Sequence, residues 1–255
     1  MFSDKAFNSQ HCLGAINSIN WARILAQTVY YFLAYFSLRR ALSPSSKLSI
    51  QFVVPTGNFG DVLAGYYAKR MGLPMQNLGI ATNANDILAR FWKSGKYEKV
   101  ASSPTGSGET APVNGASDGK QTSGGGVKET LSPAMDILVS SNFERLLWYL
   151  AFDDAGENRQ IACKTLSDWM GHVKSDGRVE VPIAVLEAAR RDFVAERISD
   201  EQVWLLLSEV DGNCMLIIWF KTLATIRETF SESKYVADPH TAVGIAAAKL
   251  VAPTK

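Results

Sequence analysis

The spacing of apolar residues in the first part of the chain predicts strands that alternate with helices. The apolar run "KLSIQFVV" (47–54) predicts a strand, and its unbroken apolar end is typical of strands buried on both faces. A helical pattern follows at 61–71, a second short strand at 78–82 and another helix at 85–95. Strand, helix, strand and helix in succession predict an α/β fold with a doubly wound, mostly parallel sheet flanked by helices.

Helical spacing is also found before and after this region. Residues 20–39 predict a core helix, and its aromatic residues are better explained by core or subunit packing than by a cofactor site. These aromatic residues are Trp21, Tyr30, Tyr31, Phe32, Tyr35 and Phe36. Amphipathic helices are predicted at 158–177 and 182–199, and a last helix begins with Asp238 as its cap and Pro239 in its first turn.

A further helix is predicted in the segment "LSPAMDILVSSNFERLLWYL". Ser141 or Asn142 is placed to cap this helix at its N-terminus. Its apolar side is formed by Phe143, Leu146, Leu147 and Leu150.

Two stretches depart from these periodic patterns. Residues 102–126 contain no aromatic residue, Leu or Ile and are rich in Gly, Ser, Thr and Pro, which predicts a low-complexity surface loop inserted into the domain. A regulatory role for this loop is the alternative. Residues 203–220 carry two apolar clusters around Glu209–Asn213, and this pattern alone predicts a β-hairpin that turns at Asp211–Gly212.

Composition and charge exclude several classes of function. With 26 Lys and Arg against 25 Asp and Glu, the chain has no basic excess typical of nucleic-acid binding. Cys12, Cys163 and Cys214 show neither CxxC spacing nor metal-ligand spacing to histidines, so we expect no metal site and a reducing compartment. The N-terminus lacks the pattern of a signal peptide, and the apolar stretch 24–38 is shorter than a membrane span. We therefore expect a cytoplasmic protein that binds neither nucleic acid nor membrane.

The loop between the first predicted strand and its helix carries candidate chemistry. Gly57 and Gly60 place bare backbone N–H groups at the positive end of a helix, an arrangement that suits a phosphate. The loop matches neither the Walker A pattern nor GxGxxG, and no Lys-Ser or Lys-Thr pair follows it. From spacing alone, a glycine-bearing turn without a ligand explains the pattern equally well.

Four segments, in order, resemble the threonine synthases, which are pyridoxal phosphate (PLP) enzymes of fold type II, the class of tryptophan synthase β. The segment "PTGNFGDVLAGYYAKRMGLP" (55–74) resembles their phosphate-binding loop. "GAINSINWARILAQTVYYF" (14–32), "LSPAMDILVSSNFERLLWYL" (131–150) and "DPHTAVG" (238–244) resemble further segments of the same family, and the fungal form is the most similar. The resemblance implies that residues 1–255 are part of the PLP-dependent catalytic domain.

The resemblance also implies an activity. Threonine synthases are lyases of threonine biosynthesis that convert O-phospho-L-homoserine and water to L-threonine and phosphate, with PLP held by a lysine as a Schiff base. It further implies that backbone N–H groups of the glycine loop bind the PLP phosphate and that Asp61 opens the following helix. The implied cofactor-binding residues are Gly57, Asn58, Phe59, Gly60 and Asp61.

Substrate contacts are implied for the segment "NSINWAR". Ser18, Asn20 and Arg23 are the candidates, since an arginine suits a phosphate or carboxylate. A helix cap by Asn20 and a salt bridge of Arg23 are the structural alternatives, which we favour slightly. For His240, a structural role at a helix start is favoured over acid-base catalysis, because the family moves protons with its lysine.

The chain also departs from the family pattern. It has no counterpart to the Schiff-base lysine segment or to the closing segment whose Ser or Thr faces the pyridine nitrogen, so no catalytic residue is assigned. We therefore expect an internal fragment that is inactive by itself. Residues 203–220 have no place in the family pattern either, because "SDEQ" would continue naturally into "KTLATIRETF". Our hypothesis is that these residues are a translated intron.

Two alternatives to threonine synthesis stay open from the sequence. The first is a threonine-synthase-like phospholyase that acts on a related phosphorylated amino acid. The second is a non-catalytic remnant of the PLP fold that serves as a binding or regulatory subunit. The sequence does not determine the oligomeric state.

Overall fold

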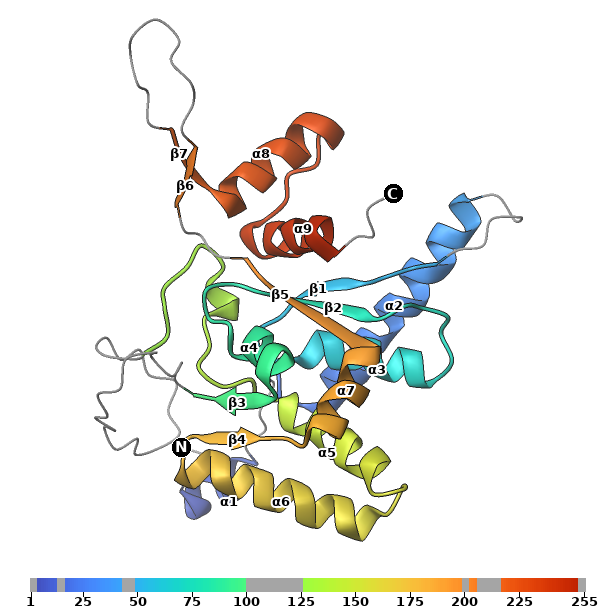
Figure 1. The fold of residues 1–255 in the computed structure, drawn as a ribbon, viewed down its shortest axis with the longest axis vertical. Helices are drawn as coiled ribbons and strands as arrows, with labels where there is room; N and C mark the ends of the chain where they lie inside the picture. Colours follow the sequence, from blue (N-terminus) through green and yellow to red (C-terminus); the bar gives the residue numbers. More distant parts are fainter. Residues whose placement is uncertain are drawn as a thin grey trace, which may run out of the picture.

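The computed structural model of the protein is shown in Figure 1. It describes residues 4–12, 17–42, 49–99, 126–198, 202–205 and 217–251. The helices are α1 (Lys5–His11), α2 (Trp21–Ala41), α3 (Gly60–Arg70), α4 (Ile87–Ser94), η1 (Pro133–Met135, a 3₁₀ turn), α5 (Phe143–Asp154), α6 (Arg159–Ser175), α7 (Ile183–Asp192), α8 (Lys221–Ser233) and α9 (Pro239–Val251). The strands are β1 (Val53–Pro55), β2 (Leu78–Thr82), β3 (Lys96–Glu98), β4 (Arg178–Glu180), β5 (Phe193–Arg197), β6 (Gln202–Leu205) and β7 (Ile217–Phe220).

A parallel sheet with the strand order β1-β2-β5 forms the centre of the molecule. Val54 pairs with Ile80, and Ile80 pairs with Ala195 on the other side. Figure 1 shows α9 on one face of this sheet and α3 and α4 on the other. The predicted α/β fold with a parallel sheet flanked by helices is therefore confirmed.

The strand β2 is buried at every residue because helices cover both faces of the sheet. Its Gly79 permits the close approach of β1, since a Cβ at this position would lie 2.8 Å from Cγ2 of Val53. The ladder between the two strands continues past the end of β1, where the N–H of Thr56 donates to the carbonyl oxygen of Ala81 over 2.7 Å. The loop that follows β1 is thereby fixed to the sheet.

The prediction of one helix over 182–199 is wrong in its second half. The helix α7 ends at Asp192, and the next five residues form β5, which pairs with β2 over its whole length. Phe193 and Ala195 are buried and alternate with half-buried neighbours, which is the two-residue period of a strand. Pairing with β2 supplies the backbone hydrogen bonds that a longer helix would have made, so the tertiary contact decides the structure.

The predicted core helix 20–39 is found as α2, but its aromatic residues do not share one face. Its buried residues are Ile24, Thr28, Tyr31 and Tyr35, which recur at helical spacing. Trp21 and Tyr30 are 56% and 63% exposed, so the core interpretation fails for them. Packing of these exposed residues against another subunit stays a prediction.

Several predicted helix boundaries are confirmed. Gly95 ends α4 in the left-handed conformation, with φ of 77°. The Oδ1 of Asp238 accepts from the N–H of His240 over 2.9 Å, as a cap of α9. The apolar side of α5 is buried as predicted, at Phe143, Leu146, Leu147 and Leu150.

The two exceptional stretches lie largely outside the described residues. Within 203–220, β6 pairs with β7 in antiparallel fashion, with Trp204 opposite Ile218, as the hairpin prediction requires. The predicted turn at Asp211–Gly212 falls outside the described part, as does 102–126 apart from Gly126. The interpretations of 102–126 as a loop insertion and of 203–220 as a translated intron stay hypotheses.

Candidate phosphate-binding site

The glycine loop connects the carboxyl end of β1 to the first turn of α3. In open α/β sheets, ligands bind at this edge, where loops leave the strands. The N-terminus of α3 adds a partial positive charge there, because the N–H groups of its first turn have no partner inside the helix. The loop therefore occupies the position in the fold that best suits a bound anion.

Phe59 shapes this loop through its backbone and anchors it through its side chain. Its φ of 63° and ψ of 9° place it in the left-handed region immediately before α3. The ring is 1% exposed and packs against Phe143 and Trp92 at centroid distances of 5.3 and 6.1 Å. Burial of this aromatic ring offsets the unfavourable φ, so Phe59 offers a backbone N–H rather than its ring to a ligand.

The backbone N–H groups of residues 57–61 face one side of the loop, which we call the candidate cradle. The carbonyl oxygens of the loop are bound from the opposite side. Ser140 Oγ donates to the carbonyl oxygen of Gly57 over 2.8 Å, and the N–H of Asn142 donates to that of Asn58 over 3.1 Å. A planar peptide points its N–H away from its C=O, so these bonds turn the next two N–H groups toward the open side. Within the described part of the chain, no acceptor pairs with the N–H groups of residues 57–61. These unpaired donors fit a phosphate.

Gly57 is required because a second loop packs directly against it. A Cβ at this position would lie 3.0 Å from the carbonyl oxygen of Ala134 and 3.1 Å from Cα of Met135. His240 holds this second loop, since its Nε2 accepts from the N–H of Ala134 over 3.1 Å while its Nδ1 lies 3.1 Å from Oδ1 of Asp238. Acceptance at Nε2 requires that this nitrogen carry no proton, which supports the structural role favoured for His240.

The three predicted substrate residues differ in their surroundings. Ser18 is brought to the glycine loop, because Asn142 Nδ2 donates to its carbonyl oxygen over 2.8 Å and its Oγ lies 3.4 Å from that of Ser141. Asn20 caps α2, with its Oδ1 accepting from the N–H of Ala22 over 2.9 Å. Arg23 is exposed, and the alternative of a salt bridge for it finds no partner among the described residues.

Sequence reasoning missed Asn142 and Tyr31 as residues of this site. Asn142 stands at the start of α5 as predicted, but its side chain makes no capping bond there and binds the two loops instead. The Tyr31 hydroxyl donates to the carbonyl oxygen of Asp61 over 2.9 Å, and burial raises the pKa of Tyr31, which keeps this donor protonated. In the sequence, the polar residues of "VSSN" between two apolar runs could have indicated that Asn142 binds neighbouring backbone groups.

The carboxyl end of β2 is closed by a saturated polar network. The Nδ2 of Asn83 donates to Oδ1 of Asp136 over 2.7 Å and to Oγ of Ser132 over 3.0 Å. Asp136 also accepts from the N–H of Thr130 over 2.9 Å. Because each carboxylate oxygen already has a donor, this network pins the loop 130–136 to the sheet edge beside Gly57.

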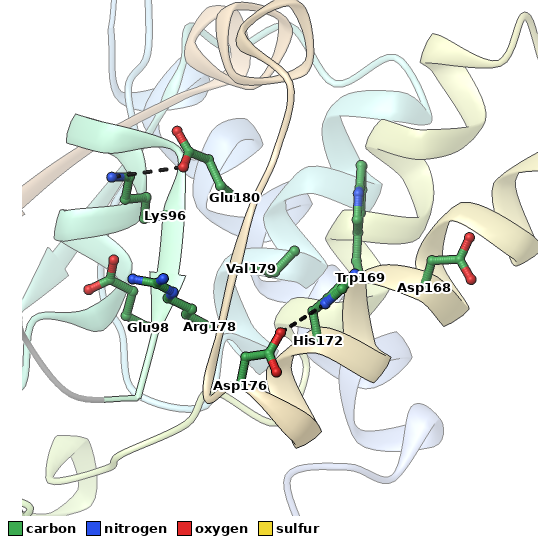
Figure 2. A pocket seen from close by; sticks show the side chains of 9 residues that line it. All are labelled: Lys96, Glu98, Asp168, Trp169, His172, Asp176, Arg178, Val179 and Glu180. Carbon is green, nitrogen blue, oxygen red and sulfur yellow. Dashed lines mark hydrogen bonds and ion pairs between the residues drawn. The ribbon is translucent and has the colours of Figure 1, made fainter. Parts of the chain in front are cut away.

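A surface cavity of about 550 Å³ lies elsewhere, between the β3-β4 pair and α6 (Figure 2). Two ion pairs form among its lining residues, with His172 Nδ1 3.0 Å from Asp176 Oδ2 and Lys96 Nζ 3.8 Å from Glu180 Oε2. Its lining includes no residue of the loops 17–20, 57–61 and 140–142. The candidate site is therefore the glycine loop and not this cavity.

Two further features are absent from the described residues. No group of three or more His, Cys, Asp or Glu side chains there is arranged to hold a metal ion. Likewise, no helix in the described ranges is long and apolar enough to cross a membrane.

Comparison with known proteins shows that the chain is similar to threonine synthases. Threonine synthase of Schizosaccharomyces pombe is 48% identical over 250 residues, which are 96% of this chain and 41% of the relative. The crystal structure of the yeast threonine synthase superposes with a TM-score of 0.76 at 42% identity. The matched region is 98% of this chain and 41% of the yeast enzyme. A structure described as PLP-bound threonine synthase from Brucella melitensis has a TM-score of 0.72 at 37% identity, and covers 100% of this chain and 42% of its own.

No protein-family model matches the chain. The chain spans about two fifths of the length of the curated relatives that it matches. The agreement nevertheless extends over nearly all of its residues, in sequence and in fold, and it confirms the resemblance of the four segments. Over nearly all of its residues, the chain is therefore homologous to about two fifths of a threonine synthase.

Proposed function

We propose that this chain supplies the cofactor-phosphate cradle of a PLP-dependent threonine synthase. The reaction is the conversion of O-phospho-L-homoserine and water to L-threonine and phosphate, in threonine biosynthesis. The observation that carries the proposal is the row of unpaired N–H groups at residues 57–61, where β1 leads into α3. The relatives support it, since each of those compared is a threonine synthase and one is described as PLP-bound.

The residues present fit the phosphate of PLP. A phosphate monoester carries several acceptor oxygens and negative charge, which match a set of backbone donors at a helix N-terminus. Gly57, Asn58, Phe59, Gly60 and Asp61 would hold it through their N–H groups, while Ser140 and Asn142 keep their peptide planes turned in the required direction. The bound cofactor supplies an electron sink for carbanion chemistry at the substrate.

The substrate side of the site is proposed for the segment before α2. Ser18 is the member of the predicted set that lies against the cradle, because its carbonyl oxygen accepts from Asn142 Nδ2. Arg23 leaves its guanidinium exposed near the start of α2, where a phosphate or carboxylate of a small-molecule substrate can approach it. Asn20 shapes the segment as the helix cap. A cytoplasmic location and the lack of turnover by these 255 residues alone stay predictions.

The proposal is tested by ligands that differ only in the phosphate. Deoxypyridoxine 5′-phosphate and deoxypyridoxine lack the aldehyde, so neither forms a Schiff base with surface lysines. Calorimetric titration of the purified chain is expected to show at least about tenfold tighter binding of the phosphorylated ligand, since several charge-assisted hydrogen bonds are added. Equal affinity for the two ligands would contradict the proposal.

A pair of variants at Asp61 tests the role of the backbone donor. Asp61→Pro removes one N–H in the first turn of α3, where proline is tolerated, and Asp61→Ala is the matched control that keeps it. Both variants lose the same charge. We expect Asp61→Pro to bind deoxypyridoxine 5′-phosphate about tenfold more weakly than Asp61→Ala, the effect of one hydrogen bond to a charged group. Identical affinities of the two variants would place the phosphate elsewhere.

A further inference from the structure

Asn142 connects two loops that are far apart in the sequence. Its Nδ2 donates to the carbonyl oxygen of Ser18 over 2.8 Å and to that of Asn58 over 3.0 Å. The residue is 0% exposed, so neither carbonyl bond can be exchanged for water at low cost. A side-chain amide has two N–H donors, and here each of them serves a different loop.

Arg145 fixes the orientation of this amide. Its Nη1 donates to Oδ1 of Asn142 over 2.5 Å, and its Nη2 donates to the carbonyl oxygen of Ile19 over 2.7 Å. A flipped amide would turn its oxygen toward two carbonyl oxygens and its nitrogen toward the guanidinium, so the orientation follows from the surrounding groups. The pair Asn142 and Arg145 therefore binds two consecutive carbonyls of the 17–20 segment.

We propose that Asn142 is a positioning residue that couples the phosphate cradle to the 17–20 segment, so that occupation of the cradle also orders the segment proposed to bind substrate. The inference rests on the proposed function and deepens it. The physical link is the Asn58–Phe59 peptide unit, whose C=O is bound by Asn142 and whose N–H faces the cradle. A phosphate bound to the N–H of Phe59 would fix this peptide unit. The peptide carbonyl would then hold Asn142 in place, and Asn142 in turn holds Ser18.

Hydrogen-deuterium exchange tests the coupling directly. In the unaltered protein, saturating deoxypyridoxine 5′-phosphate is expected to slow exchange in peptides covering 57–62 and also in those covering 17–20. In Asn142→Ala, the 17–20 amides are expected to exchange about tenfold faster without ligand and to respond to the ligand no longer, because a bond at a buried site is lost. Ser141→Ala, which removes only a 3.4 Å contact to Ser18, is the matched control and should behave as the unaltered protein.

A second variant keeps the test decisive if Asn142→Ala does not fold. The side chain of Arg145 is partly exposed, so Arg145→Lys should be tolerated. The substitution removes the guanidinium group whose two nitrogens bind Asn142 and the carbonyl oxygen of Ile19. It should raise exchange at 17–20 while leaving the helices α5 and α6 protected. The coupling is overturned if Asn142→Ala and Arg145→Lys leave exchange at 17–20 unchanged, or if Ser141→Ala changes it as much as Asn142→Ala.

These outcomes are separable from failure of the proposed function. The change in exchange between Asn142→Ala and the unaltered chain is measured without any ligand. If the unaltered chain binds deoxypyridoxine 5′-phosphate no better than deoxypyridoxine, the cradle assignment fails. The link that Asn142 makes between the two loops is still tested by the exchange rates without ligand.

Discussion

The hydroxyl of Tyr31 on α2 donates a hydrogen bond to the carbonyl oxygen of Asp61 on α3 across 2.9 Å. The ring of Tyr31 lies so close to α3 that a Cβ on Gly65 would stand 2.7 Å from two of its carbons. Helix α2 is thereby packed against the first turns of α3, the helix whose N-terminus forms the proposed cradle. The position of the proposed anion site thus depends on a helix that follows directly on the predicted substrate segment.

Tyr31→Phe should destabilise the protein modestly. The variant removes the hydroxyl donor from a buried position and keeps the ring, so we expect the free energy of unfolding to fall by about 1 kcal/mol. Urea unfolding followed by circular dichroism measures this change. Tyr30→Phe is the matched control, because Tyr30 is 63% exposed on the same helix. An equal loss in both variants would show that the bond to Asp61 contributes nothing specific.

The two glycines of the cradle should respond differently to alanine. At Gly57 a Cβ would meet backbone atoms of Ala134 and Met135 at 3.0 and 3.1 Å, and backbone cannot move aside easily. We expect Gly57→Ala to lower the free energy of unfolding by about 1–3 kcal/mol. At Gly60 the nearest atom is Asn142 Nδ2 at 3.5 Å, an ordinary contact, so Gly60→Ala should be close to neutral. Thermal unfolding of both variants decides, and a larger loss for Gly60→Ala would contradict the structure.

Asp61 should make stability depend on pH. Partial desolvation raises the pKa of its carboxyl, with a hydrogen bond involving Tyr31 acting in the opposite direction. A raised pKa means that the folded protein binds this proton more readily than the unfolded chain, so the charged form is slightly disfavoured above the folded pKa. Asp61→Asn is therefore expected to unfold at a higher temperature than the unaltered protein at pH 7. This difference should shrink as the pH falls through the raised folded pKa and should vanish below 3.8, the ordinary value for Asp. A lower unfolding temperature for Asp61→Asn at pH 7 would refute this.

Asp238 should have the opposite pH dependence. Hydrogen bonds from Thr241, followed by those from His240, lower the pKa of its carboxyl to about 2. Its stabilising effect is therefore complete above the ordinary value of 3.8 and is lost as the pH falls toward about 2. Asp238→Ala is expected to cost about 1 kcal/mol of stability at pH 7.

The matched control for this cap is Asp238→Asn, which keeps an acceptor for the first turn of α9 while removing the charge. Urea titrations at pH 7 and pH 3.5 should show a smaller loss for Asn than for Ala. If both substitutions are equally harmful at pH 7, the charge rather than the cap geometry is responsible.

The local elements of the sheet core could be predicted from the chain because their signals are local. An apolar run before paired glycines predicts β1, the loop and α3, and Gly95 ends α4 through a φ that glycine adopts readily. The strand β5 was missed because "DFVAER" contains both a helical and an alternating pattern. Only the hydrogen bonds offered by the edge of β2 favour the strand, and that edge comes from residues more than one hundred positions earlier.

The same division applies to the candidate site. The sequence by itself determined the fold class, the glycine loop that we propose to bind an anion, and the similarity to threonine synthases, because each is written in consecutive residues. Only the tertiary structure decided which groups orient that loop: Ser140 and Asn142 bind its carbonyls, and Tyr31 fixes the helix behind it. The reason is that a hydrogen bond between loops depends on atoms brought together from distant parts of the chain. Their residue types alone, an Asn before a helix or a Tyr within one, are compatible with many other partners.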